Sequence, residues 1–137
     1  MKTRLVGHID AETIQLLHLD IKENTPIFLG ESNYKHLQTS HPDAFTKYFR
    51  YLEKILAEPD YVNLNPRDNS IKYIKQISEY VVIGVRVSAK GTAFARTIFI
   101  FEDWKFKQYQ NGGYLKVHTK KTPSAEDALS KSSRQGD

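Results

Sequence analysis

Two apolar segments with a period of two restrict the fold of this chain more than any other feature. In residues 81–88 a valine or isoleucine stands at most alternate positions, and residues 93–101 are similarly apolar. Ala89-Lys90-Gly91 joins the two segments, and glycine accepts the positive φ that tight hairpins need. The pattern predicts an antiparallel hairpin. Similar runs at 61–65 and 71–77 add two more strands.

The first half of the chain has mainly helical signals, with a short strand expected at residues 3–7 and a short extended segment at residues 25–30. Asp10 is a predicted N-cap for a helix over residues 11–17, and a shorter helix is expected at 33–37. Pro42 breaks that helix, because the residue before proline avoids the helical region. A single apolar stripe then runs through residues 43–57. We therefore expect an α+β fold in which N-terminal helices pack on a four-stranded antiparallel sheet.

The chain has 137 residues, which fits one domain, and we place this domain at residues 1–115. Residues 116–137 are basic and end in a polar stretch without apolar periodicity, which predicts a disordered tail. The net charge of +4 is compatible with a nucleic-acid partner but does not require one. The absence of cysteine excludes disulfides and thiol catalysis. No run suits a membrane span or a signal peptide, so the predicted location is cytoplasmic, with no membrane partner.

In their order and spacing, three motifs resemble a known family. They are a histidine-bearing helical segment that ends in His41-Pro42-Asp43, the Pro59-Asp60 step before the first strand of the sheet, and the hairpin with one arginine in each strand. Over residues 7–109 the chain resembles the phage-type branch of the barnase, EndoU, colicin and RelE-like (BECR) nuclease superfamily. The resemblance implies helices packed on a four-stranded antiparallel sheet. It also implies metal-independent RNA cleavage, often in toxins or mobile-element proteins.

Two histidines, His36 and His41, are candidates for proton transfer, because imidazole titrates near neutral pH. His36 lies in the predicted helix before the break, and His41 stands directly before Pro42. Each also has a structural interpretation, His36 as a packing or hydrogen-bonding residue of the helix and His41 as a cap of the turn. No acidic residue accompanies them at regular ligand spacing, so we expect no metal site and no cofactor.

Arg86 and Arg96 stand in apolar strands where another aliphatic residue is usual. Arginine keeps its charge and binds phosphate with a planar fork. If the hairpin closes as predicted, the two side chains converge on one phosphate, and the small Gly84 leaves space for a ligand backbone. Thr97 and Ser88 can add hydroxyl groups. The alternative is that the arginines form cross-strand ion pairs with acidic residues.

Four further residues are candidates for substrate binding. Lys72 and Tyr73 line the strand beside the hairpin, where Tyr73 can stack on a base or simply pack in the core. Lys35 on the histidine-bearing helix and Lys90 at the hairpin tip are steering charges or solvated lysines.

Together these residues and the resemblance predict a metal-independent endoribonuclease, of the kind found in toxins and phage or mobile-element effectors. A histidine would take the proton of the ribose 2′-hydroxyl, and the arginines would stabilise the charge on the phosphate. RNA is the expected partner, and an antitoxin or immunity protein is a second one. The alternative is a catalytically inactive module on the same fold that binds RNA or a protein partner.

Overall fold

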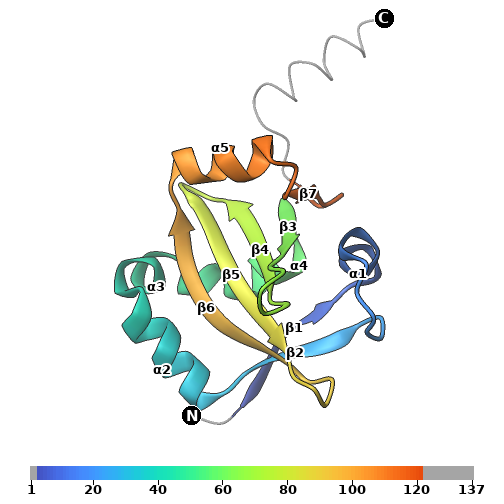
Figure 1. Ribbon diagram of the computed structural model, residues 1–137. Helices are drawn as coiled ribbons and strands as arrows, with labels where there is room; N and C mark the ends of the chain where they lie inside the picture. The colour runs from blue at the N-terminus through green and yellow to red at the C-terminus, as the bar shows by residue number, and fades with distance from the viewer. Residues whose placement is uncertain (1–2, 122–137) are drawn as a thin grey trace, which may run out of the picture.

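The computed structural model describes residues 3–121, which build one sheet of seven strands in the order β1-β2-β6-β5-β4-β3-β7 (Figure 1). All neighbouring strands are antiparallel except β2 and β6, which are parallel. The strands are β1 (Arg4–Ile9), β2 (Thr25–Leu29), β3 (Tyr61–Leu64), β4 (Ile71–Gln76), β5 (Tyr80–Val87), β6 (Ala93–Phe101) and β7 (Lys116–Val117). The helices are α1 (Ala11–Leu17), α2 (Glu31–Ser40), α3 (Pro42–Tyr48), α4 (Leu52–Ala57) and α5 (Asp103–Asn111), with a 3₁₀ turn η1 (Phe49–Tyr51) between α3 and α4.

The prediction of N-terminal helices on a four-stranded antiparallel sheet is wrong. The strand expected at residues 3–7 forms as β1, but β1 and β2 both join the sheet, and the sheet is mixed because β2 pairs in parallel with the start of β6. That pairing joins Phe28 to Phe94, which are far apart in the sequence, and β1 then adds antiparallel to β2. The hairpin β5–β6 and the strands β3 and β4 do form where the period-two pattern predicts them. Local periodicity finds a strand but does not identify its partner.

The helix boundaries follow from local chemistry. Asp10 is the N-cap of α1, as predicted, and its side chain accepts a hydrogen bond of 2.8 Å from the backbone N–H of Thr13. Pro42 occupies the first turn of α3, which suits proline because it has no N–H to leave unpaired. The predicted continuous helix over residues 43–57 is instead interrupted at η1, so α3 and α4 are separate.

The two faces of the sheet carry different clusters of apolar side chains. The larger cluster lies under α1 to α4 and includes Ile83 and Val85 of β5 together with Leu37 of α2. The smaller cluster lies under α5, where Phe106 packs on Val82. Figure 1 shows α5 across only one end of β4, β5 and β6, with α2 and α3 beside β6. We call the part of this second face that α5 leaves uncovered the open face; it carries Lys72, Gly84, Arg86, Phe94, Arg96 and Thr97.

The C-terminal part of the described chain returns to the body of the domain. Lys116 and Val117 pair with β3, and His118 is buried, with its ring nitrogen Nε2 3.0 Å from Oδ2 of Asp10. The ordered fold therefore extends past residue 115, where the sequence placed the start of the tail, because a buried histidine ties this segment to the start of α1. The remainder of the predicted tail, residues 122–137, lies outside the described residues. Within residues 3–121 no helix combines the length and apolar character needed to cross a bilayer.

Candidate functional site

A β-bulge places the two predicted arginines in one shallow hollow of the open face. Arg86 of β5 lies directly opposite Phe94 of β6, and the register then shifts between Gly84 and Val85. A bulge lets two consecutive residues oppose one partner. Arg86 and Arg96 line a hollow of about 310 Å³ together with Phe94 and residues of the hairpin. The two predicted arginines therefore line the same hollow.

Arg86 and Arg96 form no ion pairs with the described residues 3–121. Both are exposed, and within residues 3–121 neither lies within salt-bridge distance of a carboxylate. Asp68, in the turn before β4, interacts electrostatically with Arg86. Hydrogen bonds from Ser70 are the main cause of the lowered pKa of Asp68, and the positive charges of Arg86 and Lys72 lower this pKa further. The cross-strand ion pair considered as the alternative is thus not what the described residues form.

Gly84 does not leave the open space that the sequence suggested. A Cβ atom at this position would lie 2.5 Å from the Cγ2 methyl of Thr97, which is closer than real Cβ contacts. Thr97 therefore lies across the backbone of β5, in register with Gly84. Only glycine fits at position 84, because the side chain of Thr97 packs over its backbone. Thr97, rather than a ligand, therefore fills this space.

Lys72 of β4 continues the same row, because it pairs with Gly84, which in turn pairs with Thr97. Partial burial is the main cause of the lowered pKa of Lys72; Asp68 opposes this effect and the positive charge of Lys105 in α5 adds to it. A half-buried lysine with a lowered pKa, next to unpaired arginines, is typical of functional sites. Lys105 and Asp68 were not identified from the sequence, because only the fold brings α5 and the β3–β4 turn to Lys72.

The two histidines occupy different surroundings. His41 lies between α2 and α3, and its ring centroid is 5.8 Å from that of Phe99 in β6. Phe99 is in register with Val82 on the same face as Gly84, so His41 reaches this face around the edge of β6. His36 is exposed and pairs with Ser40 in its own helix at 3.2 Å. No hydrogen bond or ion pair among the described residues joins His36 to the sheet candidates.

Of three other substrate-binding candidates, one lines the arginine hollow and two lie away from it. Ser88 lines the arginine hollow and accepts a hydrogen bond of 3.2 Å from the backbone N–H of Thr92. Lys90 is exposed at the hairpin tip, where Gly91 adopts the predicted positive φ of 82°. Lys35 is exposed on α2 and forms an ion pair with Glu31 at 3.4 Å. Of these, only Ser88 touches the hollow.

Tyr73 cannot stack on a base. Its side chain is 1% exposed and belongs to the core under the helices, on the opposite face from Lys72. Its hydroxyl has no hydrogen-bond partner among the described residues. Burial, with a contribution from the charge of Asp10, raises the pKa of Tyr73 far above its usual range. The alternation of β4 points this ring inward, which corrects the proposed stacking role.

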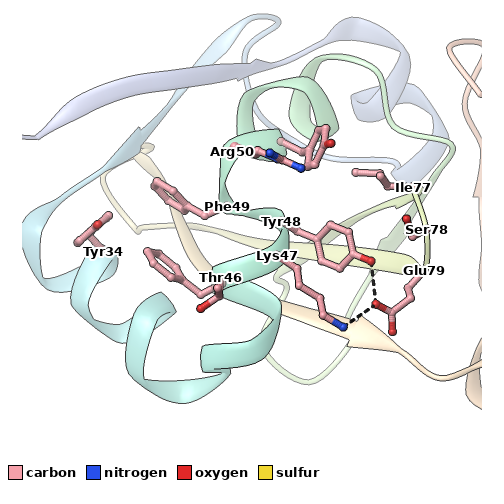
Figure 2. A pocket seen from close by; sticks show the side chains of 11 residues that line it. Tyr34, Thr46, Lys47, Tyr48, Phe49, Arg50, Ile77, Ser78 and Glu79 are labelled. Atoms are coloured by element: carbon pink, nitrogen blue, oxygen red, sulfur yellow. Dashed lines mark hydrogen bonds and ion pairs between the residues drawn. The ribbon is translucent and has the colours of Figure 1, made fainter.

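A larger cavity of about 750 Å³ lies on the helical side, between α3–η1 and the β4–β5 turn (Figure 2). Its polar groups are partly paired with one another. Tyr48 donates a hydrogen bond of 2.7 Å to Glu79, and the ammonium group of Lys47 lies 3.6 Å from the same carboxylate. Arg50 lies over the ring of Tyr51, 5.0 Å from its centroid. None of the predicted site residues lines this cavity, so the arginine hollow is the better candidate.

The comparisons with known proteins give one family match. The family model described as phage-Barnase-EndoU-ColicinE5/D-RelE like nuclease3 matches residues 4–108, which include all of the sheet candidates. No curated protein and no solved structure gave a significant match. Within residues 3–121, no group of three or more histidine or acidic side chains is arranged to hold a metal ion.

Proposed function

The chain belongs to the phage-type barnase, EndoU, colicin E5/D and RelE-like nuclease family, and on this premise we propose that it is an endoribonuclease that needs no metal ion. The observation that carries the proposal is that Arg86 and Arg96 share one hollow on the open face and form no ion pair with the described residues 3–121. The family supplies nuclease chemistry, and the arginines supply a phosphate site. The choice of RNA and of a metal-free mechanism is our inference from the groups around that hollow.

In this mechanism, Arg86 and Arg96 bind the scissile phosphate. Each guanidinium offers a planar set of N–H donors, and the negative charge that develops on the phosphate oxygens strengthens these contacts. Fixed cations thereby perform the charge neutralisation that a metal ion performs in other nucleases. Thr97, beside Arg96 at the bulge, adds a hydroxyl donor.

Proton transfer takes place on the two sides of this phosphate. His41 approaches from the edge of β6, and Lys72 lies two strands away on β4. His41 accepts the proton of the ribose 2′-hydroxyl. The freed oxygen attacks phosphorus and forms a 2′,3′-cyclic phosphate, and the bond to the 5′-oxygen breaks as that oxygen takes a proton from Lys72. A lowered pKa makes the Lys72 ammonium a better acid for this step.

The test is cleavage of a defined single-stranded RNA in excess EDTA, with product analysis for the cyclic phosphate. We expect the wild type to cleave, and Arg86→Ala and His41→Ala each to lose about 100-fold or more in kcat/KM. Arg67→Ala is the matched control, since it removes an exposed arginine from the β3–β4 turn. His36→Ala should likewise retain activity within about threefold, because His36 bonds within α2.

Activity that chelation abolishes would refute the metal-free mechanism. A folded wild type that binds RNA but never cleaves it, at any pH between 5 and 9, would favour the inactive binding module. If His36→Ala proves as damaging as His41→Ala, the assignment of the base is wrong.

We further propose that an antitoxin or immunity protein with an acidic surface covers the open face in the cell. Its cluster of Lys72, Arg86, Arg96 and Lys105 is complementary to such a surface. Expression of the wild type should arrest growth, and Arg86→Ala should relieve the arrest. Equal growth of both strains, with active enzyme in the lysate, would contradict a toxic role.

A further inference from the structure

A row of apolar side chains crosses four strands of the sheet and ends at Arg86. Leu5 of β1 is in register with Phe28 of β2, Phe28 with Phe94 of β6, and Phe94 with Arg86 of β5. Residues in register on neighbouring strands share one face and lie side by side. The four residues therefore form a continuous row, which we call the cross-strand row.

The cross-strand row is accessible to a ligand. Leu5 is 48% exposed, and Phe28 and Phe94 are each partly exposed. The two rings lie 6.3 Å apart between centroids and are tilted by 48°. Neither belongs to the buried clusters on the two sides of the sheet. Exposing three aligned apolar side chains to water is unfavourable in free energy, and apolar groupings of this kind at a protein surface mark binding sites.

The position of the cross-strand row relative to the arginines indicates its ligand. Phe94 lines the same hollow as Arg86 and Arg96, so a phosphate held there would place the neighbouring base over the ring of Phe94. Adjacent strands are about 4.8 Å apart, so the row extends about 14 Å from Arg86 to Leu5. Aromatic faces next to cations are the surfaces on which proteins stack unpaired bases.

We propose that the cross-strand row is a stacking track for unpaired bases, which makes the site selective for single-stranded over double-stranded RNA. The inference rests on the proposed function, because it takes the arginine hollow to be the phosphate site. One base stacks on Phe94 and the next on Phe28, and Leu5 contacts the strand where it leaves the protein. Bases inside a duplex are paired and stacked on each other, so they cannot lie on these rings.

The test measures binding, not cleavage, so that it is independent of catalysis. The probe is a fluorescent single-stranded RNA of mixed sequence, 2′-O-methylated throughout to prevent attack by the 2′-oxygen. We expect Phe94→Leu to weaken its binding by about 5- to 150-fold, the range for loss of one stacked base. Phe94→Tyr keeps a ring and should bind within about threefold of the wild type. Trp104→Leu is the matched control, because Trp104 is an exposed aromatic residue on α5 and not part of the row.

An abasic scan locates the contact. Replacing one nucleotide at a time by an abasic residue should weaken binding of the wild type at one or two adjacent positions. At one of these positions the Phe94→Leu variant should lose nothing further, because the ring and the base are lost together. The wild type should also bind the duplex form of the probe more weakly than the single strand, and Phe94→Leu should reduce that preference.

Three outcomes would overturn the inference. They are equal binding of single strand and duplex by the wild type, unchanged binding by folded Phe94→Leu, and a concentration-dependent dimer that Leu5→Lys dissociates. The last result would mean that a second copy of the chain covers the row. Failure of the proposed function is separate from these outcomes. If the wild type never cleaves RNA but shows the abasic position effect, the proposed function fails and the stacking track stands. If the wild type cleaves RNA and Phe94→Leu changes nothing, the phosphate site stands and the stacking track fails.

Discussion

Gly84→Ala tests the geometry at the centre of the site with the smallest possible change. The added Cβ would meet the Cγ2 methyl of Thr97 at 2.5 Å and Thr97 Cβ at 3.8 Å. The first distance is about 1 Å short of ordinary contact, while the second is already ordinary. Gly84 has no positive φ, so alanine brings no backbone strain here and the clash alone sets the cost.

The cost follows from the stiffness of threonine. A β-branched side chain has few χ1 choices, so Thr97 must leave its rotamer or the two strands must separate slightly. Overpacking of this kind typically lowers the free energy of unfolding by about 1–3 kcal/mol. Because Thr97 is next to Arg96 at the bulge, we also expect kcat/KM for RNA cleavage to fall at temperatures where the variant is fully folded.

A double-mutant cycle isolates this contact. Thr97→Ser removes the Cγ2 methyl, so Gly84→Ala in that background should cost less than about 0.5 kcal/mol. The assay is urea unfolding of the wild type, both single variants and the double variant, at constant slope. A cost of Gly84→Ala that is the same in both backgrounds would refute the argument, because the destabilisation would then come from something other than the Thr97 methyl.

Three further predictions concern the rest of the described fold. Lys75→Met removes the ammonium group that lies 3.3 Å from the Asp60 carboxylate, in a pair whose side chains are 6% and 4% exposed, while the backbone N–H of Gln76 still donates to that carboxylate. Because breaking a buried ion pair is strongly destabilising, we expect urea unfolding to show a loss of about 3–5 kcal/mol. Burial by itself raises the pKa of Asp10, but hydrogen bonds from Thr13 and the nearby His118 outweigh it and hold this pKa below 3.8. The stabilisation from Asp10 is therefore present above the unfolded pKa and is lost as the pH falls through the folded pKa, so unfolding curves of wild type and Asp10→Asn should converge below about pH 4 and separate at pH 7. His118→Ala removes the buried contact between the C-terminal segment and Asp10, and should lower the free energy of unfolding by about 1–3 kcal/mol at pH 7. Limited proteolysis should then cut the variant early near residue 118, and a digestion pattern identical to that of the wild type would show that His118 does not hold this segment in place.

Much of the candidate site follows from local patterns. Alternation along β5 places Arg86 on the face opposite Ile83, and the hairpin signal at Gly91 brings Arg96 beside it. The same alternation argues against a stacking role for Tyr73, since its neighbours Lys72 and Ile74 are those that face α5. The bulge between Gly84 and Val85 has no local signature that separates it from a regular ladder, so the position of Thr97 was not predictable.

The sequence by itself determined the pieces that depend on neighbouring residues. Cap chemistry at Asp10, the helix break at Pro42 and the period of two in β3 to β6 all act within a few residues. Tertiary structure alone decided that β2 pairs in parallel with β6 and that β7 returns to β3, because a strand's own hydrogen-bonding groups accept any edge that burial and register allow. That long-range choice turned an expected four-stranded sheet into a seven-stranded one. It also aligned Phe28 with Phe94 beside the arginines, which no local pattern specifies.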